Sequence, residues 1–418
     1  MLRLFAALAA AAPLLFVNLA GLGCRAAEPS TQPQAAKPAV RAQRAAPKPA
    51  PKKVRKTMIV YVGTYSGKEQ QGIRVFRLDA QTGALTPLGG ASGVGNPSFV
   101  ALHPNGRFLF AVAEVGNFDA KGNGAVASFA TDPETGALKL LNQQSSGGNG
   151  PCHLSVDPAG KNVLVANYGG GSVACLPVGE DGRLRPATAF VQHTGSSVNK
   201  ERQGEPHAHS INTDAAGRFV VSADLGLDKL LVYRLDAATG KLTANDPPTG
   251  NVHAGAGPRH VAFHPNGRFV YAVNELDSTV TAFGFEKNRG TLTEIQTLST
   301  LPASGATGSN YPAEILAHPS GKFIYASNRG HDSLAIYATD DATGKLRLVG
   351  HQATQGKTPR GFGISPSGDF LIAANQETNT LIVFRVDQTT GRLTQAGPAV
   401  EVPRPVCVVI APAREATK

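Results

Sequence analysis

The chain has 418 residues, of which 41% are hydrophobic and 17% charged, so its composition is that of a globular protein rather than a disordered one. Its 47 Gly and 29 Pro favour many short strands and turns over long helices. Residues 1–57 hold ten Lys and Arg against one acid, Glu28, whereas the rest of the chain holds 30 basic and 29 acidic residues. The net charge of +10 therefore belongs to the start of the chain and does not indicate a nucleic-acid partner.

Residues 1–24 are predicted to be an export signal. Met1-Leu2-Arg3 is followed by an apolar run that ends in small residues at Gly23. A retained membrane anchor is an alternative, since about 20 apolar residues can span a bilayer. Cys24 also resembles the cysteine of a bacterial lipoprotein signal, although Gly21 stands where that signal prefers Leu. We therefore expect an exported protein, either periplasmic or anchored on the outer side of the inner membrane.

Residues 25–57 are rich in Pro, Ala, Lys and Arg and have almost no large apolar side chains. Such a segment cannot bury enough surface to fold, so we predict a disordered basic linker. It either acts as a soluble spacer or tethers the protein to the membrane or cell envelope through its charge.

The four cysteines show neither metal-ligand spacing nor a disulfide framework. Cys24 lies in the predicted signal. Cys152, Cys175 and Cys407 are interpreted as small apolar residues, and a Cys152–Cys175 bridge is the less favoured alternative.

From residue 58 onwards, one pattern of strands and turns recurs. Each unit has a first strand, a turn of the Pro-x-Gly type, an apolar second strand, a third strand and a second glycine turn. The second turn is marked by seven glycines, which are Gly83, Gly136, Gly182, Gly240, Gly290, Gly344 and Gly391. Four-stranded units with a period of about 50 residues predict an all-β fold, a seven-bladed β-propeller.

The two ends of the repeat region predict how the ring closes. Residues 59–62 fit a second strand with no first strand before it, and residues 405–412 fit a first strand with no second strand after it. The C-terminal strand should therefore complete the first blade, which leaves no long unpaired edge. The predicted propeller domain spans residues 58–413.

Polar side chains recur where the first strand of each unit begins and its second strand ends. These are the sixth and fifth positions before the turn proline and the seventh and eighth after the turn glycine, and a hairpin brings them to one rim. They differ between units, whereas a structural position would repeat one residue, so we predict a ligand site there. The candidate residues on or beside this rim are His153, Asn167, His207, His209, Arg259, His260, Asn274, Glu275, Glu314, Asn328, Arg329 and Arg360.

The histidines divide into two groups. His207 and His209 lie on one side of an extended segment, so a metal site completed by His153 or Glu275 is an alternative. Arginines at the same rim would repel a cation, and we therefore expect no metal and no other cofactor. Three further histidines precede the turn proline and are expected to be turn residues, and these are His103, His264 and His318.

Arg259, Arg329 and Arg360 favour a small anionic ligand, because guanidinium groups hold carboxylate or phosphate in a bidentate manner. The alternative is that each arginine pairs with a glutamate and only stabilises the ring. Glu275, Glu314 and Glu377 are the available glutamates.

Six short segments, in order along residues 58–412, resemble the seven-bladed propeller lactonase family, which includes a 6-phosphogluconolactonase and a fungal carboxy-muconate lactonizing enzyme. The segments are residues 60–65, 165–168, 205–209, 257–260, 273–275 and 327–330. The resemblance implies a metal-independent active site formed by His207 or His209 with Arg259, Glu275 and Arg329. Glu275 or His209 would be the base, and the two arginines would hold anionic groups.

The implied function is an exported lactonase that hydrolyses a small anionic lactone or the lactone of a sugar acid. The family's bacterial phosphogluconolactonases are expected in the cytoplasm, so an export signal leaves the natural substrate open. A lactone-forming cycloisomerase with the same residues is one alternative. A non-catalytic exported propeller that binds a partner is the other.

Overall fold

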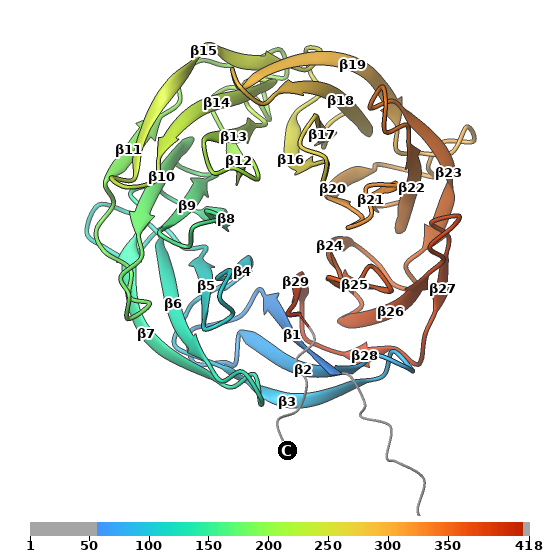
Figure 1. The fold of residues 1–418 in the computed structure, drawn as a ribbon, viewed down its shortest axis with the longest axis horizontal. Coiled ribbons are helices and arrows are strands. Elements are labelled where there is room, and N and C mark those ends of the chain that lie inside the picture. Colours follow the sequence, from blue (N-terminus) through green and yellow to red (C-terminus); the bar gives the residue numbers. More distant parts are fainter. Residues whose placement is uncertain (1–56, 413–418) are drawn as a thin grey trace, which may run out of the picture. The chain divides into compact units, whose positions relative to one another are not determined.

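The computed structural model describes residues 57–412, and these residues form strands and turns without a helix. The strands form seven antiparallel sheets, which lie as blades around a central axis (Figure 1). The predicted all-β, seven-bladed propeller with four-stranded blades is confirmed. The predicted export signal (1–24) and basic linker (25–57) lie outside the described residues, apart from Thr57. Within the described residues, no helix is long and apolar enough to cross a membrane.

The blades follow one another along the chain. Blade 1 contains β29 (Pro405–Ile410), β1 (Thr57–Thr64), β2 (Ile73–Asp79) and β3 (Leu85–Ala91). Blade 2 contains β4 (Val100–Leu102), β5 (Phe108–Ala113), β6 (Ala125–Thr131) and β7 (Leu138–Ser145). Blade 3 contains β8 (Pro151–Val156), β9 (Asn162–Asn167), β10 (Ser172–Pro177) and β11 (Ala189–Gln192). Blade 4 contains β12 (Ala208–Thr213), β13 (Phe219–Asp224), β14 (Lys229–Asp236) and β15 (Lys241–Asn251).

The remaining blades repeat this order. Blade 5 contains β16 (Pro258–Phe263), β17 (Phe269–Asn274), β18 (Thr279–Glu286) and β19 (Thr291–Ser299). Blade 6 contains β20 (Tyr311–Ala317), β21 (Phe323–Arg329), β22 (Ser333–Thr339) and β23 (Leu346–Ala353). Blade 7 contains β24 (Pro359–Ile364), β25 (Phe370–Asn375) and β26 (Thr380–Val386), and its outer strand is split into β27 (Leu393–Gln395) and β28 (Val400–Glu401).

Burial explains why the strands of a blade differ in sequence. Second strands such as β5 and β17 are buried along their whole length and are almost entirely apolar. Outer strands such as β7 and β15 are partly exposed and carry polar residues. This difference follows from position, because a second strand is covered by a neighbouring blade on each face.

The repeated turns join neighbouring blades. The ring Nε2 atoms of His103, His264 and His318 lie 2.7–3.0 Å from the carbonyl oxygens of turn glycines in the following blades. Gly344 in a second turn has φ of 73°, and a Cβ there would lie 2.3 Å from the Phe269 ring. Glycine is thus required both for the turn conformation and for close packing between blades.

The buried cysteines behave as small apolar residues. Cys152, Cys175 and Cys407 are all free thiols, so the alternative Cys152–Cys175 bridge is wrong. Cys175 and Cys407 belong to hydrophobic clusters between blades.

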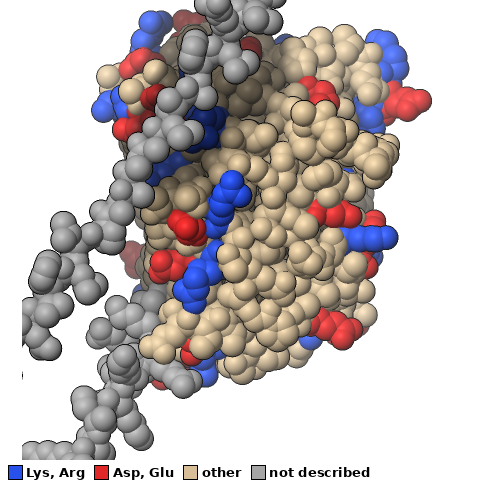
Figure 2. Space-filling view, turned by 90° about the vertical axis from the view of Figure 1, so that its right-hand side faces the viewer, with Lys and Arg blue, Asp and Glu red and all other residues tan. Residues whose placement is uncertain are grey.

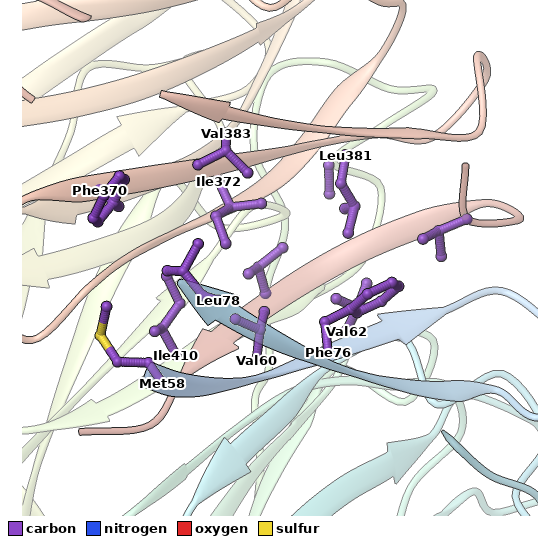
Figure 3. Close-up of a cluster of buried hydrophobic side chains, with 13 residues drawn as sticks. Met58, Val60, Val62, Phe76, Leu78, Phe370, Ile372, Leu381, Val383 and Ile410 are labelled. Atoms are coloured by element: carbon purple, nitrogen blue, oxygen red, sulfur yellow. The ribbon is translucent and has the colours of Figure 1, made fainter. Parts of the chain in front are cut away.

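The predicted closure of the ring is confirmed. β29 pairs with β1, with Val60 opposite Ile410 and Val62 opposite Val408. A cluster of buried side chains from β1, β2 and β29 packs against β25 and β26 of blade 7 (Figure 3). The C-terminal strand therefore gives blade 1 its inner strand and joins the last blade to the first.

The side of the ring shown in Figure 2 carries separate basic and acidic side chains among uncharged residues. This mixed surface agrees with the near balance of charges beyond residue 57. The visible face presents no single-signed field of the kind that nucleic acid requires.

Deletion of residues 404–418 should abolish cooperative unfolding or make the protein insoluble, because it removes β29 and exposes the edge of β1. Deletion of residues 413–418 alone is the matched control, since it leaves β29 in place. Urea titration followed by circular dichroism tests this expectation. A cooperative transition of unchanged midpoint in the longer deletion would contradict the assignment of β29 to blade 1.

Candidate active site

A β-bulge at the start of the first strand shapes the site in several blades. In blade 5, Pro258 pairs with Asn274 and His260 pairs with Val273, so Arg259 is the extra residue between them. The same shift of register occurs at Cys152, His209 and Arg360 in blades 3, 4 and 7. A bulge bends its strand and redirects a side chain. All four bulged residues line a cavity at this rim.

The cavity has a volume of about 370 Å³, which suits a small ligand. It is lined by Glu114, Cys152, Tyr168, Arg202, His209, Glu275, Tyr311, Arg329 and Arg360. A smaller adjoining cavity shares some of these residues and adds Tyr65, Ser98, Phe99, Arg259, His260, Glu314 and Val406. All seven blades therefore contribute to the walls.

Three arginines converge on Glu275. Its Oε2 atom accepts hydrogen bonds from Arg259 Nε at 3.0 Å and from Arg329 Nη2 at 2.7 Å. Its Oε1 atom accepts one from Arg202 Nη2 at 2.7 Å. Burial alone would raise the pKa of Glu275, but the positive charges of Arg329, Arg259 and Arg202 lower that pKa to about 2.

These contacts make Glu275 a poor base. Its carboxylate is ionised at neutral pH, and both oxygens already accept hydrogen bonds from cations, so it has little tendency to take a proton. Arg259 Nη1 also donates to Ala313 O at 2.6 Å, and Arg329 Nε donates to Tyr311 O at 2.9 Å. Arg259 and Arg329 therefore do pair with a glutamate, as the alternative interpretation of the arginines expected.

Arg360 differs from the other arginines of the cavity. Its guanidinium lies over the ring of Tyr65, 5.4 Å from the ring centroid. Among the described residues, no hydrogen-bond acceptor or carboxylate lies within bonding distance of it, although it lines both cavities. Its N–H groups are therefore free to bind an anionic ligand.

His209 supplies a neutral imidazole. Its ring packs against Tyr168 and His260, with centroids 5.2 and 5.3 Å apart. Burial, with the charge of Arg259, holds the pKa of His209 well below its usual value. Cys152 Sγ lies 3.7 Å from His209 Nδ1, but burial raises the pKa of this thiol, so it stays protonated and is not a nucleophile.

His260 and Glu314 form a buried pair beside the smaller cavity. His260 Nδ1 lies 2.9 Å from Glu314 Oε1, and its Nε2 atom has no hydrogen-bond partner among the described residues. Burial raises the pKa of Glu314 to about 7. His153 packs against His260 and Phe99 and accepts a hydrogen bond from Ile211 N, and it is outside the lining of both cavities.

Besides His153, four predicted ligand-binding residues do not reach either cavity. Asn167, Asn274 and Asn328 are fully buried, and each donates its side-chain amide to neighbouring Ser, Thr or backbone oxygens. His207 stacks on Tyr168 and lies 3.1 Å from its carbonyl oxygen. These contacts hold the strand ends and the adjoining loop in place.

The metal-site alternative lacks a ligand set in this part of the chain. No group of three or more His, Cys, Asp or Glu side chains within residues 57–412 is placed to hold a metal ion.

Several lining residues were absent from the sequence prediction. Tyr65, Glu114 and Tyr168 follow second strands at the position that Glu275 occupies in blade 5, so the repeat alignment contained the signal for them. Arg202 lies in the loop between β11 and β12, which is longer than the corresponding connections between the other blades. Gln203 anchors this loop by donating to Leu225 O and Asp228 Oδ1.

Comparison with known proteins agrees with this fold. The family model "Lactonase, 7-bladed beta-propeller" matches residues 59–410. A 6-phosphogluconolactonase of Bacillus subtilis is 39% identical over 350 residues, which cover 84% of this chain and 97% of the relative. One from Formosa agariphila is 35% identical over 310 residues, covering 73% and 86%. The solved structure of a periplasmic gluconolactonase of Pseudomonas aeruginosa has a TM-score of 0.79 and 34% identity, covering 86% of this chain and all of the other.

These features define the class of protein as a seven-bladed propeller with arginines gathered around a cavity at one rim. The chain belongs to the seven-bladed β-propeller lactonase family. The predicted family and the predicted enzyme class, a lactonase, are confirmed.

Glu275→Gln should destabilise the protein by about 3–5 kcal/mol, because it leaves three arginines without their shared counterion. The lowered pKa of Glu275 gives stability that is full above its unfolded pKa of about 4.3 and is lost as the pH falls towards 2. Urea unfolding at pH 7 and pH 3.5 measures both effects, and the loss caused by the substitution should shrink at the lower pH. Glu134→Gln in an exposed turn is the control. Equal stability of the two variants at pH 7 would contradict this account of the cluster.

Proposed function

We propose that the protein is an exported lactonase that hydrolyses the lactone of a small sugar acid bearing a negative charge. The observation that carries the proposal is the charge balance of the cavity. Three arginines share the carboxylate of Glu275, and Arg360 faces the cavity without an acidic partner among the described residues. An anionic ligand would supply the missing negative charge.

The proposed reaction is attack of water on the lactone carbonyl. The carbonyl oxygen gains negative charge as the new C–O bond forms, and the ring C–O bond then breaks to give a hydroxy acid. The neutral ring of His209 and the remaining N–H groups of Arg329, which both line the cavity, would stabilise this charge, and Arg360 would bind the anionic group of the substrate. Because the arginines supply the positive charge that the step needs, the proposal includes no metal ion.

The substrate class and the location come from the relatives and from the N-terminal sequence. The relatives from Bacillus subtilis and Formosa agariphila are named 6-phosphogluconolactonases, and the Pseudomonas structure is named a periplasmic gluconolactonase. The export signal predicted over residues 1–24 is expected of a periplasmic enzyme, like the Pseudomonas protein, rather than of a cytoplasmic one. We therefore place the protein outside the cytoplasm, free in the periplasm or tethered to the envelope through residues 25–57.

Turnover by the purified protein tests the proposal. Acid release from gluconolactone and its 6-phosphate is followed in a pH-stat, with the uncatalysed rate subtracted. We expect saturable hydrolysis, faster for the charged lactone. Loss of carboxy-muconate absorbance without lactone hydrolysis would favour the lactone-forming alternative. No turnover of any of these compounds would contradict the proposed function and favour a binding propeller.

Arg360→Met should lower kcat/KM for the phosphorylated lactone roughly 10- to 100-fold, since hydrogen bonds to a charged group contribute about 1.5–3 kcal/mol. The loss for uncharged gluconolactone should be smaller, because that substrate has no anionic group to hold. Arg347→Met, on the exposed face of β23, is the matched control. An equal loss for both lactones would show that Arg360 does not select for the negative charge.

A further inference from the structure

Two glutamates occupy the same position in different blades and have opposite surroundings. Glu275 follows β17 in blade 5, and Glu114 follows β5 in blade 2. Both line the larger cavity. Glu275 bonds three arginines, whereas no Lys, Arg or His among the described residues lies within ion-pair distance of Glu114. Paired carboxylates with contrasting environments are a common basis for dividing acid–base roles.

Two hydroxyl groups fix the Glu114 carboxylate. Ser98 Oγ donates to Oε2, and Tyr65 Oη donates to Oε1 at 3.2 Å. The backbone of Glu114 is also held, because its N–H donates to Asn96 O and its carbonyl oxygen accepts from Asn96 Nδ2. A carboxylate has about four acceptor positions, so these two bonds leave room for a water molecule from the cavity. The side chain is therefore oriented and still able to accept a proton.

Tyr65 places this carboxylate beside the unpaired arginine. Its hydroxyl bonds Glu114, and its ring lies beneath the Arg360 guanidinium. Burial raises the pKa of Tyr65 to about 12, so the phenol remains a hydrogen-bond donor at neutral pH. A ligand anion held by Arg360 would thus lie next to Glu114.

The other acid–base groups are less suited to accept a proton from water. The oxygens of Glu275 bond to arginines, and the ring of His209 is surrounded by Arg259, Tyr168 and His260. Burial raises the pKa of Glu114, and Arg360 and Arg259 oppose this effect with Ser98 and Tyr65. A carboxylate of raised pKa is a stronger base than one tied to three cations.

We propose that Glu114 is the general base of the hydrolysis, and this inference rests on the proposed lactonase function. Glu114 takes a proton from the water molecule as the water oxygen bonds to the lactone carbonyl carbon. When the ring C–O bond of the tetrahedral intermediate breaks, the protonated carboxyl returns that proton to the departing ring oxygen. One water is consumed, one hydroxy acid is formed, and Glu114 ends in its starting state.

Glu114→Gln should reduce kcat on the order of 10²–10⁴-fold, the usual contribution of a general base, with little change in KM. Glutamine keeps the size of the side chain, and its amide oxygen can accept from one of the two hydroxyls while its NH2 group donates to the oxygen of the other. The urea midpoint of the variant should therefore stay close to that of the parent. Glu134→Gln, at an exposed turn, is the matched control and should keep full activity.

Two further measurements separate a base from a structural residue. Added formate should restore part of the activity of Glu114→Ala, because it can occupy the space of the lost carboxyl. The kcat/KM of the parent should fall at acid pH with a pKa above the usual 4.3 of glutamate, as Glu114 becomes protonated. In Glu114→Asp this acid limb should shift, because the shorter carboxylate is withdrawn from Tyr65 and Ser98.

The outcomes distinguish this inference from the proposed function. If the parent hydrolyses no lactone, the proposed function fails and the inference fails with it. If the parent is active and Glu114→Gln keeps its kcat within about threefold, a barrier change under about 1 kcal/mol, only the inference is overturned. If Glu114→Gln does not fold, an unshifted pH profile in Glu114→Asp together with no formate rescue of Glu114→Ala would overturn it.

Discussion

The antiparallel pairing of the first and second strands in each blade determines the geometry of the cavity. This pairing places the start of the first strand beside the end of the second strand. In blade 5, for example, Pro258 lies opposite Asn274. The bulge that follows turns one residue of the first strand out of the regular pairing and into the cavity wall. Because the unit is repeated around a closed ring, each blade contributes a side chain at an equivalent place, and the identity of that side chain sets the chemistry.

Equivalent places acquire different properties because each blade has different neighbours. Glu275 lies between Arg259 of its own blade and Arg329 of the next, and Arg202 reaches it from a loop before blade 4. Glu114 meets Tyr65 and Ser98 instead. The first carboxylate is therefore fixed as a negative charge that organises cations, and the second remains open to protonation. A ring of similar units thus supports an asymmetric site, through different side chains at equivalent positions and one long loop.

The fold was predictable because its evidence is periodic. The glycine turns and the apolar second strands recur in each unit. The unmatched strands at the two ends of the repeat region complement each other. Closure through β29 followed from counting strands. Part of the cavity followed too, since the alignment of repeats brought Cys152, His209, Arg259 and Arg360 to one position before the bulge was known.

The roles of the site residues were less predictable, because a role depends on which partners a side chain meets. Asn167, Asn274 and Asn328 share their position with Asn375, and this recurrence is itself the mark of a structural residue that the sequence interpretation overlooked. Arg202 has no place in the repeat, so no alignment of units could bring it to Glu275. The pairing of Arg259 and Arg329 with one carboxylate, and the freedom of Arg360, depend on side-chain directions that spacing along the chain does not determine. The alignment of the repeats therefore located the site, but only its hydrogen bonds separate the arginines that bind Glu275 from Arg360, which has no carboxylate partner among the described residues.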